Sequence, residues 1–397
     1  MLAHSPPLPL IIDHFDDRYK DLTAEEEEGI IFALQHRDRV RCIRLLKPIP
    51  ILQKLIVALD GEFPILDFLL IEHQRFHRPV IENLPNLDFP ETFRAPHLRR
   101  VLLKNFATPI ESPPLTTMME NLVNLSLGAI PSSGYFGPST LVKRLSHIPQ
   151  LERLGIGFSC YDHSRDIERQ LLPTPIMTRV TLPNLRRLSF RGTGAYLEAL
   201  LPRLAIPLLE KLHVSFFNRM IYSISHLRQL TSTTRHLWPK TATFTFFKGH
   251  LNVVGYLYNG AKMYTLFMEI GGRHLEWQVG SAAQVFPALK TVFSAVEDLT
   301  FEYQRNYVPS EWNRQADRTQ WREFLGSFDK VKTLRVELGI LEQVSRALQP
   351  GEGDSPADLF PELQELSYPA TDSSFNIFAP FIDARQKAGH PVTVVHR

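Results

Sequence analysis

The stretch LPNLRRLSFRG, residues 182–192, contains the unit from which most of the chain is built. Leu185, Leu188 and Phe190 follow one another at spacings of three and then two residues, and Pro183 precedes the first of them by two. A spacing of two places both side chains on one face of a strand. The leucine three residues earlier lies where the chain turns into the strand, so it joins the same core. The proline ends the preceding helix, because it lacks an amide donor and biases its predecessor toward extended geometry.

The same apolar pattern recurs along the chain. Its clearest copies are Leu98/Val101/Leu103, Leu122/Leu125/Leu127, Leu151/Leu154/Ile156, Leu185/Leu188/Phe190, Leu209/Leu212/Val214, Val296/Leu299/Phe301, Val331/Leu334/Val336 and Leu363/Leu366/Tyr368. Weaker copies are Val40/Ile43/Leu45, Ile65/Phe68/Leu70, Thr241/Phe244/Phe246 and Met263/Leu266/Met268. The middle residues of these copies lie 22 to 35 positions apart, which is the period of a solenoid. A single short strand cannot bury its apolar face alone, so each unit must stack on the next.

Helical patterns fill the segments between the predicted strands. Thr23 and Glu26 form a capping box, and Ile30, Ile31 and Leu34 make the apolar stripe of the helix that follows. Similar helical segments are expected near 194–204, 281–296, 317–328 and 375–389. Strand, crossover helix and strand at short spacing predict a parallel sheet with right-handed connections.

We therefore predict an α/β fold, a curved solenoid with a parallel sheet on the concave side and helices on the convex side. It would contain about twelve degenerate repeats. No linker rich in Gly or Ser interrupts the series, and 349–361 is interpreted as a loop within one unit. The whole of 1–397 is thus expected to be one domain, with a capping strand and helix in 1–39, repeats in 40–370 and a capping helix and strand in 371–397.

Composition narrows the class of protein. The chain has 397 residues, of which 44% are apolar, and its apolar runs are too short to span a membrane. Its N-terminus is a poor secretory signal, and only Cys42 and Cys160 are present, which fits a reducing compartment. We expect a cytoplasmic or nuclear protein. A net charge of +2 gives no general attraction to nucleic acid or to a membrane, so neither is predicted as a partner.

Charge is unevenly distributed over the residues that should face away from the core. Positions beside the middle apolar residue of each unit, or just after its last one, point to the concave surface. In the first seven units these positions hold Arg44, Arg100, Lys104, Arg153, Arg187, Arg191 and Lys211, against the single acid Asp67. In the last five they hold Glu269, Asp298, Glu302, Glu337 and Glu365, against Arg335.

Two interpretations of this charge pattern stay open at this point. Strand residues beside leucines are polar in any half-buried sheet, and their signs can assort by chance. Alternatively, the face is a bipolar groove that steers and orients a protein of complementary charge. In that case, reversing Arg100, Arg153 and Arg187 together should weaken partner capture and leave thermal stability almost unchanged.

The sequence contains no strong catalytic motif. There is no phosphate-binding glycine loop, dinucleotide fingerprint or G-x-S-x-G elbow. His73 and His77 stand four apart, but they follow a strand core, so a loop is favoured over a metal site. Cys160, Tyr161, Asp162 and His163 are neighbours in sequence and do not face one another, so a turn is favoured over a nucleophile. We predict no enzyme, metal or cofactor; the run Glu25–Glu28 is interpreted as a solvated helix start, and Trp312 and Trp321 as loop anchors.

The repeats resemble the leucine-rich-repeat region of F-box proteins from mushroom-forming fungi. The phrases that carry the resemblance are KPIPILQKLIVALDGEFPIL (47–66), ETFRAPHLRRVLLKNF (91–106), LPNLRRLSFRGTGAYLEALL (182–201) and IPLLEKLHVSFFNRM (206–220). In that family an N-terminal F-box binds the Skp-type adaptor of a cullin ubiquitin ligase, while the repeats hold the substrate. The resemblance thus implies a leucine-rich-repeat solenoid that binds a target protein.

This sequence differs from that family at its start. PPLPLIID follows Met1 almost at once and is interpreted as a first strand, which leaves no room for an F-box before it. No adaptor contact is therefore carried over to any residue. The expected function is the substrate-recognition region of an F-box-type ubiquitin ligase receptor. The alternatives are a repeat protein with no ligase role, and a hydrolase or transferase whose site is too dispersed to show in the sequence.

Overall fold

The fold is described from a computed structural model. It covers residues 8–15, 23–74, 86–116, 120–159, 179–217, 224–258, 264–272, 274–304, 317–351, 355, 357–369 and 377–396. Contacts within the chain form two compact units. Unit 1 comprises Met1–Gly192 and Ala199–Leu208, and unit 2 comprises Thr193–Glu198 and Leu209–Arg397. That the whole chain forms one domain stays a prediction.

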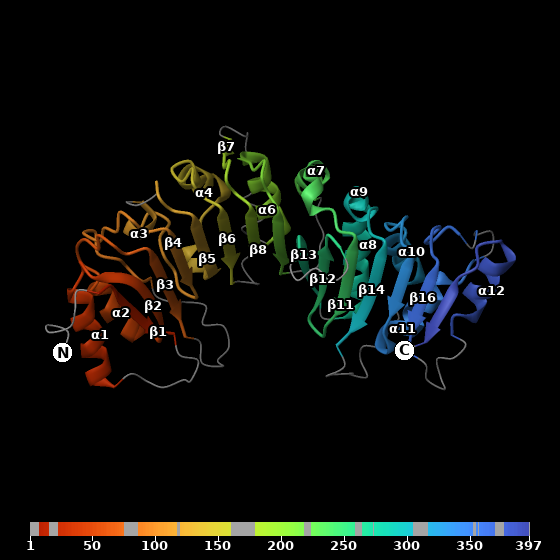
Figure 1. The fold of residues 1–397 in the computed structure, drawn as a ribbon, viewed down its shortest axis with the longest axis horizontal. Coiled ribbons are helices and arrows are strands. Elements are labelled where there is room, and N and C mark those ends of the chain that lie inside the picture. The colour runs from red at the N-terminus through yellow and green to blue at the C-terminus, as the bar shows by residue number, and fades with distance from the viewer. Residues whose placement is uncertain are drawn as a thin grey trace. The chain divides into compact units, whose positions relative to one another are not determined.

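Unit 1 contains a parallel sheet with helices packed against one face (Figure 1). In spatial order its strands are β1 (Leu10–His14), β2 (Val40–Lys47), β3 (Phe68–His73), β4 (Arg100–Lys104), β5 (Asn124–Ile130), β6 (Arg153–Phe158) and β8 (Arg187–Gly192). Its helices are α1 (Ala24–Gln35), α2 (Ile49–Val57), α3 (Pro113–Thr116) and α4 (Pro138–Leu145). A short parallel pair, β7 (Val180–Thr181) and β9 (Leu204–Ala205), was not predicted. Helix α6 (Gly194–Leu200) contains the boundary between the units.

The stacking inferred from the leucine pattern is confirmed in unit 1. Leu125 pairs in register with Leu154, which pairs with Leu188 on the next strand. All three side chains are at most 2% exposed. Neighbouring units therefore merge their apolar edges into one core, as the predicted α/β solenoid requires.

Helix α1 begins as its sequence predicts. The Thr23 hydroxyl accepts a hydrogen bond from the amide of Glu26 at 3.2 Å, and the Glu26 carboxylate accepts one from the amide of Thr23 at 2.9 Å. Ile30 and Leu34 are buried, whereas Ile31 is only half-buried. Glu25, Glu26 and Glu27 lie in the first turn, where carboxylates complement the helix dipole. Glu27 is half-buried and binds Lys54 at 2.8 Å, so the run is only partly solvated.

One weak copy of the repeat was predicted one residue out of register. Leu66, Leu69 and Ile71 are fully buried, while Ile65 is 37% exposed. Phe68 and Leu70 belong to the opposite face of β3, because side chains alternate along a strand. The sequence FPILDFLLIEH, residues 63–73, contains apolar residues in both registers, so the apolar pattern alone led to the wrong register.

Unit 2 also has a sheet with helices against one face (Figure 1). In spatial order its strands are β10 (Lys211–Phe216), β13 (Leu266–Gly271), β12 (His250–Tyr256), β11 (Thr241–Phe246), β14 (Asp298–Tyr303), β15 (Thr333–Val336), β16 (Glu365–Tyr368) and β17 (Thr393–His396). Its helices are α7 (Ser225–Thr233), α8 (Leu275–Ala288), α9 (Lys290–Phe293), α10 (Arg318–Leu325), α11 (Leu341–Leu348) and α12 (Ala379–Lys387).

The predicted order of parallel strands is wrong between β10 and β14. Strand β12 runs antiparallel to both β11 and β13, and β10 pairs with β13 instead of β11. The hairpin was missed because HLNVVGY has the period-2 alternation of a strand without the leading leucine of the repeat. Leu251 and Val253 of this strand are fully buried, so it contributes to the same core.

Aromatic side chains fill the core of unit 2. Phe244 is surrounded by the rings of Phe286, Phe293, Phe301, Phe324 and Phe328, with centroids 5.0 to 6.4 Å away. Trp321 of α10 is 1% exposed and contacts this cluster, so it is a core residue. Trp312 lies outside the described residues.

Candidate functional site

We call the side of the unit 1 sheet opposite helices α1, α2, α3 and α4 its open face (Figure 1). One row on this face consists of Arg100, Asn124, Arg153 and Arg187, which stand side by side on β4, β5, β6 and β8. Their neighbours Val101, Leu125, Leu154 and Leu188 point into the core, so the row faces outward. The structure thus places the predicted basic residues of these strands on one surface.

Three of the predicted basic residues have acidic partners that the sequence did not reveal. Arg44 binds Asp13 at 2.7 Å, and Lys104 lies 3.6 Å from Glu72. Arg100 lies 3.8 Å from Asp67, and its guanidinium is 4.5 Å from the centre of the Phe68 ring. Their charges are largely compensated within the unit.

Arg153 and Arg187 differ from these three. Neither has an ion pair with any residue that the structure describes. They are paired in register on adjacent strands, whose backbones lie about 4.8 Å apart. Like charges directly opposite each other destabilise a sheet. This pair therefore has uncompensated positive charge that an acidic group from outside would neutralise.

Small residues lie beside this arginine pair. The next row along the strands holds Ser126, Gly155 and Ser189. Two residues further along, Gly128 pairs with Lys104 and Gly157 pairs with Arg191, and the register between β5 and β6 shifts after Leu127. The stem of Lys104 lies against Gly128, because a Cβ added to Gly128 would lie 3.0 Å from Lys104 Cγ. A polypeptide can therefore come close to the sheet between basic side chains.

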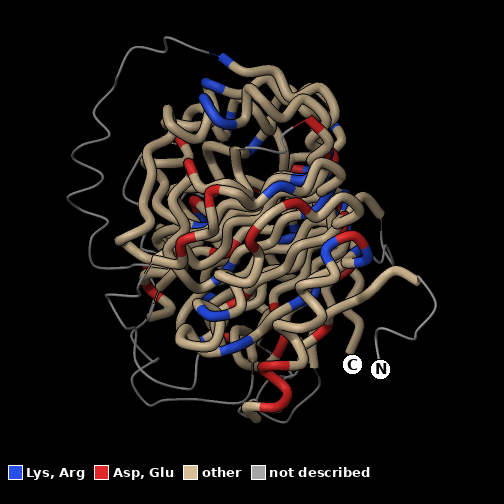
Figure 2. The backbone as a smooth tube through the Cα atoms, turned by 90° about the vertical axis from the view of Figure 1, so that its left-hand side faces the viewer, with Lys and Arg blue, Asp and Glu red and all other residues tan. Residues whose placement is uncertain are grey.

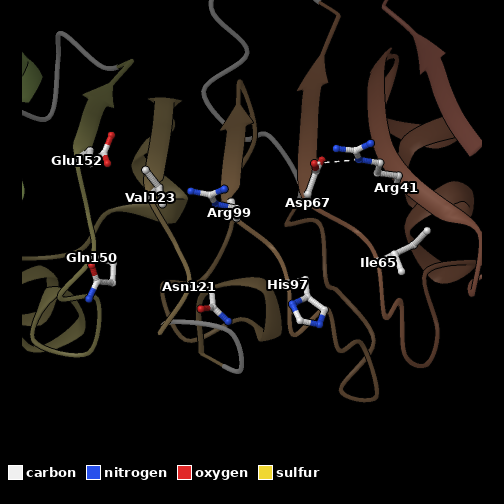
Figure 3. Close-up of a pocket in the computed structure, with 9 residues that line it drawn as sticks. All are labelled: Arg41, Ile65, Asp67, His97, Arg99, Asn121, Val123, Gln150 and Glu152. Carbon is white, nitrogen blue, oxygen red and sulfur yellow. Dashed lines mark hydrogen bonds and ion pairs between the residues drawn. The ribbon is translucent and has the colours of Figure 1, made fainter. Parts of the chain in front are cut away.

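Asp67, predicted to face outward beside Arg100, does not lie in that row. Phe68 takes this position instead, because the unit is shifted by one residue from the predicted register. Asp67 precedes β3 and lines an open groove of about 540 Å³ at the starts of the strands of unit 1. Figure 3 shows two parallel rows of side chains in this groove: Arg41, Asp67, Arg99, Val123 and Glu152 in one, and Ile65, His97, Asn121 and Gln150 in the other. Arg41 binds Asp67 at 3.2 Å.

The groove follows the repeat and does not gather reactive groups at one point. Backbone amides link its first row from unit to unit: Asp67 donates to Arg41, Arg99 to Asp67, Val123 to Arg99 and Glu152 to Val123. Asn121 donates to the carbonyl of Pro96 at 2.9 Å. The side chains of the groove are therefore spaced like the strands of the sheet, along the edge where the strands begin. This arrangement suits contact with an extended surface.

In unit 2 the predicted acidic residues also lie on the face opposite the helices. Asp298 and Glu302 flank Thr300 on β14, Glu365 begins β16, and Glu269 lies on β13. Glu337 follows β15 and is exposed, Arg335 lies within β15, and Lys211 begins β10. Glu302 accepts a hydrogen bond from the hydroxyl of Thr245 at 3.1 Å.

A charged ladder also marks the strand starts of unit 2. The Glu297 carboxylate binds Lys240 Nζ at 2.7 Å and Lys332 Nζ at 2.9 Å. Hydrogen bonds from Lys240 and then Lys332 lower the pKa of Glu297 to about 2. Lys240 directly precedes β11 and Lys332 directly precedes β15, the two strands that pair with β14. The three residues are far apart in the sequence, so the sequence analysis did not predict this cluster.

We expect Glu297→Gln to lower the free energy of unfolding by less than about 1 kcal/mol at pH 7, since exposed pairs are screened. A lowered carboxylate pKa stabilises the fold above the unfolded-state pKa, and this contribution disappears as pH falls through the folded-state value. The difference between wild type and variant should therefore vanish between about pH 4.5 and pH 2. Urea unfolding across this range measures it. Glu323→Gln, exposed on α10, is the control and should show no such convergence.

Charges of both signs are interspersed along the chain as a whole. Figure 2 shows blue and red segments scattered among uncharged, tan segments of the chain. This matches the near-neutral net charge of +2. Any charge-based recognition must therefore arise from local rows such as Arg153 and Arg187.

The two weaker chemical hypotheses concern residues that are only partly described. His73 ends β3, while His77, Cys160, Tyr161, Asp162 and His163 lie outside the described residues. In the described part, no three His, Cys, Asp or Glu side chains are grouped so that they could hold a metal ion. None of the helices described there has both the length and the apolar composition needed to cross a bilayer.

Comparison with known proteins adds little. No protein-family model matches the sequence, and no curated protein matches it significantly. A similar solved structure is that of the leucine-rich-repeat-containing protein LegL7 from Legionella pneumophila, with 12% sequence identity and a TM-score of 0.25. The match covers 75% of this chain and 92% of LegL7. The fold is established by the strand pairing within the chain described above.

Proposed function

We propose that this chain is a non-enzymatic scaffold that binds an acidic segment of a protein on the open face of unit 1. The observation that supports this most is the pair Arg153 and Arg187, which is adjacent in register and has no ion-pair partner among the described residues. The small residues Ser126, Gly155 and Gly157 beside this pair let a partner backbone approach it. Complementary charge steers and orients such a partner.

More specifically, we propose the substrate-recognition region of an F-box-type ubiquitin ligase receptor that acts in the cytoplasm or nucleus. The resemblance of the leucine-rich phrases to fungal F-box proteins supports this role. A Skp-type adaptor would be a partner only if an F-box is encoded upstream of Met1. Sequencing the full transcript distinguishes this role from that of a repeat protein without ligase function, because only the former encodes an in-frame F-box.

Binding by unit 1 can be tested with a defined probe. We expect a fluorescein-labelled peptide of alternating glutamate and glycine to bind the wild-type chain, and Arg153→Glu/Arg187→Glu to weaken binding at least tenfold, or about 1.4 kcal/mol. The stability should change by no more than about 0.5 kcal/mol, since both residues are on the surface. Fluorescence anisotropy at several salt concentrations measures affinity, and urea unfolding measures stability.

The matched control reverses two basic residues on the helical side of unit 1. Lys143→Glu/Arg144→Glu on α4 changes the net charge equally and leaves the open face intact. Equal loss of binding in this control, or unchanged binding in Arg153→Glu/Arg187→Glu, would refute the proposal.

A further inference from the structure

Aromatic side chains cluster on the open face of unit 2, where β12 interrupts the parallel order. The ring of Phe267 on β13 lies 4.3 Å from that of His213 on β10 and 5.7 Å from that of Tyr264. All three rings are half-buried. We call His213, Tyr264 and Phe267 the aromatic patch.

Core packing does not explain the aromatic patch. Leu266 and Met268, the neighbours of Phe267 along β13, are fully buried, so its ring points to the opposite face of the sheet. His213 likewise lies between Leu212 and Val214, which are also fully buried. Partly exposed aromatic residues of this kind are enriched at the centres of protein interfaces.

Carboxylates border the aromatic patch on the same face. Glu269 lies two residues beyond Phe267 on β13. Thr300 occupies the same register row as Phe267, through Val254 and Thr243, and Asp298 and Glu302 flank it on β14. With Glu337 and Glu365, the face holds five predicted acids against the two bases Lys211 and Arg335.

We infer that the aromatic patch, with Glu269, Asp298 and Glu302, docks an extended segment of a partner protein that contains arginine. A guanidinium stacks on aromatic rings and binds carboxylates through paired hydrogen bonds, whereas an ammonium does so less well. This inference shares with the proposed function the premise that the open faces bind protein. It concerns unit 2 alone and a partner segment of opposite charge.

The sheet geometry sets the spacing of the arginines. Three strand steps, from β13 through β12 and β11 to β14, separate Phe267 from Thr300 and correspond to about 14 Å. An extended chain covers this distance in about four residues. One arginine would therefore stack on Phe267 beside Glu269, and another four residues away would lie between Asp298 and Glu302.

The test compares three labelled peptides by fluorescence anisotropy. The first is Gly-Arg-Gly-Ser-Gly-Arg-Gly, the second has lysine in place of arginine, and the third has its two arginines adjacent. We expect the first to bind at least about fivefold more tightly than either of the others, because only it can both stack and span. Equal binding of all three peptides would overturn the inference, since charge alone would then account for it.

Two variants test separately the aromatic ring and the carboxylates of this surface. Phe267→Leu should reduce binding of the first peptide about fivefold and abolish its advantage over the lysine peptide, because stacking is lost. Asp298→Asn/Glu302→Gln should weaken the arginine and lysine peptides alike. Phe32→Leu, an exposed aromatic on α1, and Glu323→Gln serve as controls and should change neither. A loss in these controls as large as in the test variants would also overturn the inference.

The outcome is independent of the test on unit 1. Arg153→Glu/Arg187→Glu should leave binding of the arginine peptide unchanged, and Phe267→Leu should leave binding of the acidic peptide unchanged. If the acidic peptide fails to bind while the first arginine peptide binds more tightly than the other two, only the proposed role of unit 1 is refuted. If the acidic peptide binds as expected while the three peptides of the second test bind equally, only the inference about unit 2 is refuted.

Discussion

Phe244→Ala is expected to lower the free energy of unfolding of unit 2 by about 4 kcal/mol, the cost of removing a large aromatic side chain from a packed core. Phe244 is fully buried on β11, a strand enclosed between β12 and β14. Its ring contacts five other phenylalanine rings, with centroids as close as 5.0 Å to Phe286 and Phe324. The substitution removes apolar burial and leaves a cavity that the surrounding sheet and helices can close only in part.

Urea unfolding followed by far-UV circular dichroism measures this loss, and amide hydrogen exchange locates it. Exchange should accelerate first in β11, β12 and β14, because each unit of a stacked structure is stabilised by its neighbours. Phe244→Leu keeps much of the volume and should cost far less. Phe32→Ala, at a ring that is 47% exposed on α1, is the control for losing an aromatic residue outside the core. A cost for Phe244→Ala no greater than that of Phe32→Ala would contradict this picture of the core.

The second large effect is expected at Arg385, which is 1% exposed on α12. Its guanidinium donates to the carbonyls of Leu359, Phe360, Pro361, Leu363 and His390 at 3.2 to 3.5 Å. Burial lowers the pKa of Arg385, but arginine titrates so far above neutrality that it stays protonated. Arg385→Ala should therefore cost about 3 kcal/mol, since it leaves several buried carbonyls without a donor.

The cost at Arg385 should reflect geometry and not charge alone. Phe360, one of its acceptors, has a left-handed φ of +53°, so the guanidinium stabilises a turn that a phenylalanine seldom adopts. Arg385→Lys keeps the charge but loses the planar set of donors, and we expect it to recover less than half of the stability. Lys387→Ala, exposed on the same helix, is the matched control. Equal melting temperatures for Arg385→Ala and Lys387→Ala would show that the carbonyl contacts contribute nothing.

Much of the candidate site was predictable because it follows from strand alternation. Once Leu154 and Leu188 are assigned to the core, Arg153 and Arg187 must face the other way. Their lack of an ion pair was not predictable, because it depends on which side chains the neighbouring strands bring close. Asp13 and Glu72 lie 31 and 32 residues from the basic groups they neutralise, Arg44 and Lys104. The aromatic patch was missed for the same reason, since His213 and Phe267 become neighbours only when β10 pairs with β13.

The sequence by itself determined the repeating unit, the capping box at Thr23 and the parallel stacking of β4, β5, β6 and β8. These features depend on residues a few positions apart, where hydrophobic periodicity and capping act. Only the tertiary structure decided the register of β3, the antiparallel insertion of β12 and the burial of Arg385. For each of these features the local sequence is compatible with more than one arrangement. Contacts with segments distant in the sequence determine which arrangement forms, and no short pattern encodes those contacts.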